Sequence, residues 1–129
     1  MSHPFPQAVT FLYVQDQERS LNFYEATLGL KKALVQDGCT ILSIDPRQTA
    51  FLGLCNCAES RPTAGMILTL VSHDLEVVHR KLTDGGYTPD GPPRYNERYN
   101  ITQFFVNDPD GHLIEVQTFH DSSWPQPVP

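Results

Sequence analysis

The strongest constraint on the fold of this chain is an internal repeat, because the same order of strand and helix patterns occurs twice. In the first half, alternating apolar residues over 9–14 predict a strand, and helical spacing follows from Asp16 to Gly29. Three more strand patterns follow, two of them joined by Asp37-Gly38, a pair typical of tight hairpin turns. The first module therefore reads β-α-β-β-β over about residues 8–54.

The second half repeats this order over about residues 66–119. Met66 to Val71 predicts a strand, and a helix follows from Asp74 to Gly85-Gly86. Later strands are expected at 102–106 and 113–119. Aligning the two halves places Val9 on Met66 and Gly53 on Glu115.

A duplicated unit of this kind buries its apolar face against its neighbour. We therefore expect an α+β fold in which each of two βαβββ modules supplies a curved sheet and the two sheets together enclose a cavity. The whole chain, 1–129, is expected to be one domain. Its proline-rich tail, 120–129, is expected to be loosely held, because proline neither donates to a sheet nor fits a helix interior.

Composition excludes several classes of function. Nine basic residues are scattered among fifteen acidic ones, for a net charge of −6, so no nucleic-acid footprint is expected. The longest apolar runs fall far below the roughly 20 residues that span a bilayer, and the first residues do not resemble a signal peptide. The three cysteines match no CxxC spacing. We expect a soluble, cytoplasmic protein with reduced cysteines that binds neither nucleic acid nor membrane.

Two sequence motifs resemble those of a known superfamily. The first is Val14-Gln15-Asp16, followed by Ser20-Leu21-Asn22-Phe23-Tyr24 and Leu28-Gly29-Leu30. The second runs Asp108-Pro109-Asp110-Gly111-His112-Leu113-Ile114-Glu115-Val116. Both are similar to motifs of vicinal oxygen chelate proteins, which include glyoxalases, bleomycin-resistance proteins and extradiol dioxygenases. The resemblance implies paired βαβββ modules that form curved mixed sheets around a cup-shaped cavity, commonly within a homodimer.

The resemblance also implies where a metal would bind. The positions that hold the metal in metal-dependent members correspond to Val9, Gly53, Met66 and Glu115. The alignment at Met66 can slip by one residue to Ile67, whose side chain cannot coordinate a metal either. Only Glu115 has a side chain that coordinates divalent ions, which need several nitrogen or oxygen ligands. We therefore expect no cofactor and no metal site. The alternative is a divalent metal held by an atypical set of ligands.

The other candidate ligand-binding residues follow from strand parity and from one polar loop. Side chains alternate between the faces of a strand, so every second residue faces the cup. A long segment, 94–100, is expected either to cover the cup as a flap or to form a plain surface loop. The candidates are Phe11, Tyr13, Phe51, Met66, Arg98, Tyr99, Gln117 and Phe119, and Leu68 and Leu70 are expected on the same face as Met66.

Glu115 is the candidate catalytic residue. An inward carboxylate binds a cation or acts as a general base, unless neighbouring donors simply satisfy it. The favoured interpretation is a metal-free protein that binds a small, largely apolar or aromatic molecule. Two alternatives stay open: a metal-dependent lyase, isomerase or dioxygenase, and a metal-free enzyme with Glu115 as base.

Overall fold

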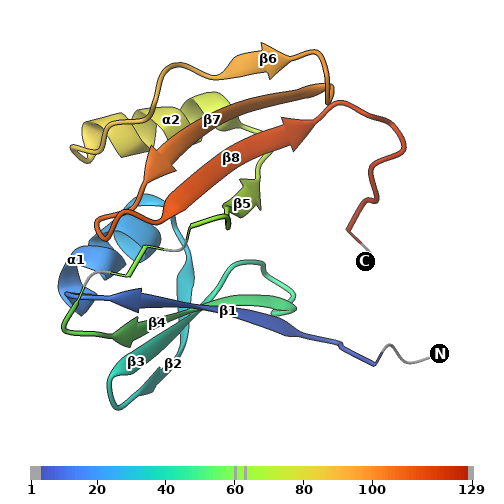
Figure 1. Cartoon of the computed structure of the whole chain (residues 1–129). Helices are drawn as coiled ribbons and strands as arrows, with labels where there is room; N and C mark the ends of the chain where they lie inside the picture. Colours follow the sequence, from blue (N-terminus) through green and yellow to red (C-terminus); the bar gives the residue numbers. More distant parts are fainter. Residues whose placement is uncertain (1–3, 60, 63, 128–129) are drawn as a thin grey trace. The chain divides into compact units, whose positions relative to one another are not determined.

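The computed structural model of the chain describes residues 4–59, 61–62 and 64–127 and consists of two βαβββ modules (Figure 1). The chain divides into two compact units. The first runs to Pro62 and also includes Asp108–Gly111, and the second holds the remaining residues. Two four-stranded mixed sheets with few helices confirm the α+β class predicted from the repeat.

The first module contains β1 (Ala8–Val14), β2 (Lys31–Gln36), β3 (Cys39–Ser43) and β4 (Ala50–Asn56), in the spatial order β1-β4-β3-β2. β1 runs parallel to β4, whereas the other pairs are antiparallel. The helix α1 (Gln17–Leu21) continues into a π-helical turn, η1 (Asn22–Thr27). Asp16 caps α1 by accepting from the backbone N–H groups of Glu18 and Arg19, as its position before the helical pattern indicates.

One face of this first sheet forms the core of the module. Burial alternates along β1, where Leu12 and Val14 are buried while Phe11 and Tyr13 are exposed. The buried face continues across β3 and β4 and is completed by side chains of the helix and the residues after it. The remaining buried apolar residues of this module are Phe23, Tyr24, Leu30, Leu42, Leu52 and Leu54.

A disulfide joins Cys39 on β3 to Cys55 on β4. The expectation that all three cysteines are reduced is therefore wrong for this pair. Their antiparallel register places the two residues directly opposite each other, with Cα atoms 4.2 Å apart. Spacing along the chain does not reveal such a register. Cys57 is the free cysteine among the described residues.

The second module contains β5 (Leu68–Val71), α2 (Leu75–Asp84), β6 (Arg94–Asn96), β7 (Ile101–Asn107) and β8 (Leu113–Phe119). The sheet order is β5-β8-β7-β6, and β5 runs parallel to β8 (Figure 1). Asp74 caps the start of α2, and Gly85 follows its last residue as the C-cap, in agreement with the expected helix end. The side chains of α2 pack on one face of the sheet, where the ring of His79 lies edge-on to that of Phe104. Among the described residues, no helix is long and apolar enough to cross a membrane.

Two segments of the second module that were expected as a loop and a loosely held tail make specific contacts with its sheet. Arg94–Asn96, within the segment expected as a flap or loop, forms the edge strand β6 and pairs with β7. In the proline-rich tail, Trp124 stacks on Phe119 with ring centroids 3.5 Å apart and planes inclined by 13°. The described part of the tail therefore returns to the end of β8.

Candidate functional site

A pocket of about 580 Å³ lies on the face of the second sheet that α2 does not cover. Side chains alternate between the two faces of β8. Glu115, Gln117 and Phe119 point to the face with the pocket, while Ile114 and Val116 are buried on the face that α2 covers. Most of its lining comes from the three strands β6, β7 and β8. The lining residues are Ile67, Asn96, Tyr99, Ile101, Gln103, Phe105, Glu115, Gln117 and Phe119.

The centre of the pocket is a carboxylate held by a polar network. Glu115 is only 9% exposed, and its register partners are Thr69 on β5 and Phe105 on β7. Thr69 Oγ1 donates to Glu115 Oε1, and Gln103 Nε2 donates to Glu115 Oε2, both at 2.8 Å. Asn96 Nδ2 in turn donates to Gln103 Oε1 at 2.8 Å. Every donor in this chain of hydrogen bonds is uncharged. Asn96 donates to Gln103, and Gln103 donates to the Glu115 carboxylate.

Two hydrogen-bond acceptors in the pocket, the Glu115 carboxylate and Gln117 Oε1, can accept further hydrogen bonds. Among the described residues, no lysine, arginine or histidine forms an ion pair with Glu115. Gln117, two residues further along β8, is 7% exposed, and its Oε1 has no hydrogen-bond partner in the described chain. A buried acceptor without a donor costs free energy unless a bound molecule or water supplies one.

Aromatic side chains form much of the remaining wall. Tyr99, Phe105 and Phe119 line the pocket, and Trp124 stacks on Phe119. The guanidinium of Arg98 lies 5.2 Å from the centroid of the Tyr99 ring and is not part of the lining. A polar centre with flat apolar walls is the usual composition of a small-molecule pocket.

Four of the predicted residues therefore meet in one pocket, namely Tyr99, Glu115, Gln117 and Phe119. Met66 does not line it, and Ile67 does. The register pairs Thr69 with Glu115, so odd-numbered residues of β5 share the face of Glu115. The expectation that Met66, Leu68 and Leu70 share this face is wrong by one residue, because the repeat alignment was shifted at the start of β5.

The predicted residues of the first module lie on the uncovered face of its own sheet. Val9, Phe11 and Tyr13 alternate along β1, and Phe51 is the register partner of Val9 on β4. The ring of Phe11 lies against Gly53, where an added Cβ would collide with it and would lie 3.1 Å from Ile41 Cδ1. The absence of a side chain at position 53 thus makes room for Phe11.

The residues at the superfamily's metal positions do not fit a divalent ion. Val9 and Met66 carry no nitrogen or oxygen donor in the side chain, and Phe11 occupies the space beside Gly53. Glu115 is the one residue at these four positions with a side-chain oxygen, and one carboxylate supplies only part of the ligand shell of a divalent ion. Among the described residues, no group of three His, Cys, Asp or Glu side chains is placed to hold a metal. We therefore derive no step through a metal.

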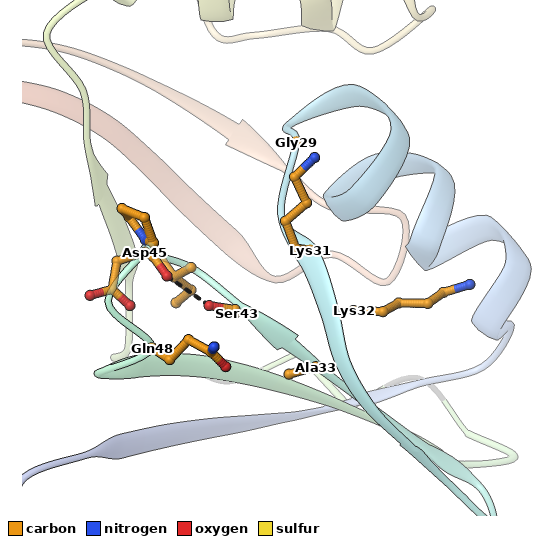
Figure 2. Close-up of a pocket in the computed structure, with 9 residues that line it drawn as sticks. Gly29, Lys31, Lys32, Ala33, Ser43, Asp45 and Gln48 are labelled. Carbon is orange, nitrogen blue, oxygen red and sulfur yellow. Dashed lines mark hydrogen bonds between the residues drawn. The ribbon is translucent and has the colours of Figure 1, made fainter.

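A second hollow, of about 360 Å³, lies in the first module between the start of β2 and the turn after β3 (Figure 2). Three of its polar side chains, Lys32, Ser43 and Asp45, contact other groups of the protein. Ser43 Oγ donates to Asp45 O at 2.8 Å, and Lys32 pairs with Glu25 at 3.7 Å. Thr49 donates to the Asp45 carboxylate, which lowers the pKa of Asp45. No sequence pattern indicated this hollow.

The fold and the pocket define a paired-βαβββ protein with a pocket on the sheet of its second module. The family model described as the Glyoxalase/Bleomycin resistance protein/Dioxygenase superfamily matches residues 6–116. The chain therefore belongs to this superfamily, and the resemblance inferred from the sequence is confirmed. No match was found among curated proteins.

Solved structures share the fold. An integron cassette protein from the Halifax Harbour sewage outfall is 19% identical, with a TM-score of 0.73 over 88% of this chain and 97% of that one. An integron cassette protein of V. cholerae is 29% identical, with a TM-score of 0.68 over 92% and 96%. TnmS3, an antibiotic binding protein from Streptomyces sp. CB03234, is 24% identical, with a TM-score of 0.72 over 92% and 96%.

Proposed function

We propose that this protein binds a small, largely apolar or aromatic molecule in the pocket around Glu115, without a metal ion. The observation that carries the proposal is the pocket itself, in which aromatic walls surround a fixed polar centre. The fold of TnmS3, described as an antibiotic binding protein, supports a binding role for this kind of chain.

The network around Glu115 favours binding because its geometry exists before a ligand arrives. Thr69 and Gln103 hold both carboxylate oxygens in place, and Asn96 fixes the amide of Gln103. A ligand that meets a fixed acceptor loses less free energy to ordering of the protein. The rings of Tyr99, Phe105 and Phe119 add apolar area, worth about 25 cal/mol for each Å² removed from water.

Glu115 is the candidate general base if the pocket also catalyses a reaction. It is the carboxylate among the residues that line the pocket, and Gln103 and Thr69 orient it. Base catalysis of this kind requires a ligand proton within hydrogen-bond reach of a carboxylate oxygen. Such activity would persist in EDTA, which separates it from a metal-dependent lyase, isomerase or dioxygenase.

We also propose a homodimer in the cytoplasm. The uncovered face of the first sheet exposes Val9, Phe11 and Tyr13, and apolar residues in such a row favour burial against another protein surface. Light scattering at micromolar concentration tests the assembly, and a monomer mass would contradict it. Because disulfides are rare in the cytoplasm, the Cys39–Cys55 bond argues against this location, and alkylation of both cysteines in freshly lysed cells is the result that would support it.

The direct test is a ligand screen by thermal shift on protein purified without chelators, followed by metal analysis. We expect aromatic compounds to raise the melting temperature equally with and without EDTA, since only ligands that favour the folded state stabilise it. Tyr99→Ala should weaken these shifts, whereas Tyr95→Ala, on an exposed ring outside the lining, serves as the control. Stoichiometric divalent metal whose removal abolishes binding would overturn the metal-free proposal.

A further inference from the structure

We infer that the molecule bound around Glu115 is a cation, specifically a planar aromatic compound that carries a protonated amine or amidine. This inference names the ligand class for the pocket and rests on the proposed function. Three independent features support it: a buried carboxylate without a counter-ion, a second acceptor without a donor, and the aromatic wall.

In the part of the chain that the structure describes, the carboxylate of Glu115 has no positively charged partner. It is 9% exposed, and its two protein donors, Thr69 and Gln103, are both neutral. An ionised carboxylate offers about four lone-pair sites, so two further hydrogen bonds are available. A buried charge is costly unless it is paired, and a ligand ammonium or amidinium supplies both the charge and the missing donors.

The amide of Gln117 extends this acceptor surface along β8. Its Oε1 is buried and has no hydrogen-bond partner within residues 4–59, 61–62 and 64–127, and Gln117 shares the face of Glu115 two residues further along β8. Two positions along a strand span about 6.6 Å. The centre of the pocket therefore presents two acceptors in a row, which favours a ligand with several donors and disfavours a carboxylate or phosphate.

The aromatic wall suits a planar cation better than a flexible one. The rings of Tyr99, Phe105 and Phe119 line the pocket, and ring faces attract cations that lie within about 6 Å. Arg98 already shows this contact with Tyr99, at 5.2 Å from the ring centroid, but it does not pair with Glu115. The net charge of −6 on the chain adds a general attraction for cations.

Three naphthalene compounds of nearly equal size test the inference by isothermal titration calorimetry. They are 2-naphthylmethylamine, which is a cation, 2-naphthylmethanol, which is neutral, and 2-naphthoate, which is an anion. We expect the amine to bind at least about tenfold more tightly than the alcohol, because charge-assisted hydrogen bonds are the stronger ones. The anion should bind most weakly.

Three variants test whether Glu115 is responsible for the preference for the amine. Glu115→Gln should remove most of the preference for the amine while leaving the affinity for the alcohol within about threefold. Glu97→Gln removes the same charge from an exposed residue outside the lining and should leave the preference intact. Gln117→Glu adds a second carboxylate and should increase the preference, which provides a test even if Glu115→Gln does not fold.

The outcomes separate the ligand class from the binding function. Equal binding of amine and alcohol, or a preference for naphthoate, overturns the cation inference and leaves the binding proposal standing. A preference for the amine that Glu97→Gln abolishes as fully as Glu115→Gln also overturns it, because the general charge would then be responsible. Failure of all three compounds to bind, together with an empty thermal-shift screen, overturns both.

Discussion

The hydroxyl of Tyr24 donates to Asp108 Oδ2 at 2.6 Å, and both side chains are buried in the first compact unit. Asp108 belongs to the Asp-Pro-Asp-Gly sequence that resembles the superfamily's closing motif, and Tyr24 belongs to the opening motif. The same turn provides Asp110, whose Oδ1 accepts from the backbone N–H of Gln15 at 2.9 Å. The two sequence motifs of the superfamily are thus linked by hydrogen bonds.

Replacing Tyr24 by Phe should destabilise the protein by about 1 to 3 kcal/mol, because the buried Asp108 carboxylate loses a donor. Urea or thermal unfolding followed by circular dichroism measures the loss. Tyr95→Phe is the matched control, since the Tyr95 hydroxyl bonds to Asn100 at an exposed site. Equal losses of unfolding free energy for Tyr24→Phe and Tyr95→Phe would show that the buried hydrogen bond between Tyr24 and Asp108 does not have this stabilising role.

The same tyrosine predicts a loss of stability at alkaline pH. Burial raises the pKa of Tyr24 well above 10, and the neighbouring Asp108 and Asp110 charges raise it further. Above pH 10 the unfolded chain loses the Tyr24 proton while the folded chain keeps it, so the folded state is progressively disfavoured. This contribution is fully present below pH 10. Unfolding free energies between pH 9 and 11 should therefore fall more steeply for the wild type than for Tyr24→Phe.

Reduction of the Cys39–Cys55 disulfide should lower stability by about 3 kcal/mol, as expected for a loop of this length. Cys39→Ser together with Cys55→Ser should give a similar loss, whereas Cys57→Ser should have little effect because Cys57 is free. Thiol alkylation and mass spectrometry of the oxidised protein should detect one reactive cysteine. Three reactive cysteines before reduction would show that the disulfide does not form.

The close contact between Phe11 and Gly53 predicts that substitutions at these two positions have non-additive effects on stability. Gly53→Ala should destabilise the first module by about 1 to 3 kcal/mol, because the new Cβ meets the Phe11 ring. Adding Phe11→Ala should recover most of this loss, since the truncated side chain clears the site. A double-mutant cycle measured by thermal unfolding gives the coupling, and additive effects would contradict the contact.

The sequence predicted the modular fold because local patterns determine it. Asp16 and Asp74 mark both helix starts, and the Asp37-Gly38 turn sets the hairpin, so these elements needed no tertiary information. β6 was missed because Arg94–Asn96 carries no alternating apolar pattern and forms only by pairing with β7. Local patterns therefore predict elements with their own signal, and not those formed by pairing alone.

Residues of the candidate site could be predicted where the alternation of side chains within one strand determines which face they point to. They could not be predicted where the answer depends on the pairing register between two strands. Glu115, Gln117 and Phe119 follow from alternation within β8 alone. The choice between Met66 and Ile67 depends on the pairing of β5 with β8, and the donors Thr69 and Gln103 lie on neighbouring strands. The Cys39–Cys55 bond depends on the same kind of information. Register between strands is a tertiary property that a single sequence expresses only weakly.

The stack of Trp124 on Phe119 makes ligand binding observable by intrinsic fluorescence. Trp124 is the one tryptophan of the chain, and Phe119 lines the pocket around Glu115. A molecule that packs on Phe119 changes the surroundings of the stacked indole, so emission should shift in wavelength or intensity as the pocket fills. The titration should give the same dissociation constant as calorimetry, using a ligand that does not absorb near 295 nm.

Two variants define what this signal means. Phe119→Leu removes the stacking partner and should shift Trp124 emission to longer wavelength without ligand, because the indole becomes more exposed to water. Tyr99→Ala should weaken ligand affinity while leaving the emission of the free protein unchanged, since Tyr99 lines the pocket and is not the stacking partner of Trp124. If calorimetric binding occurs with no change in Trp124 emission in the wild type, the ligand occupies a site away from Phe119, and the pocket around Glu115 is not the binding site.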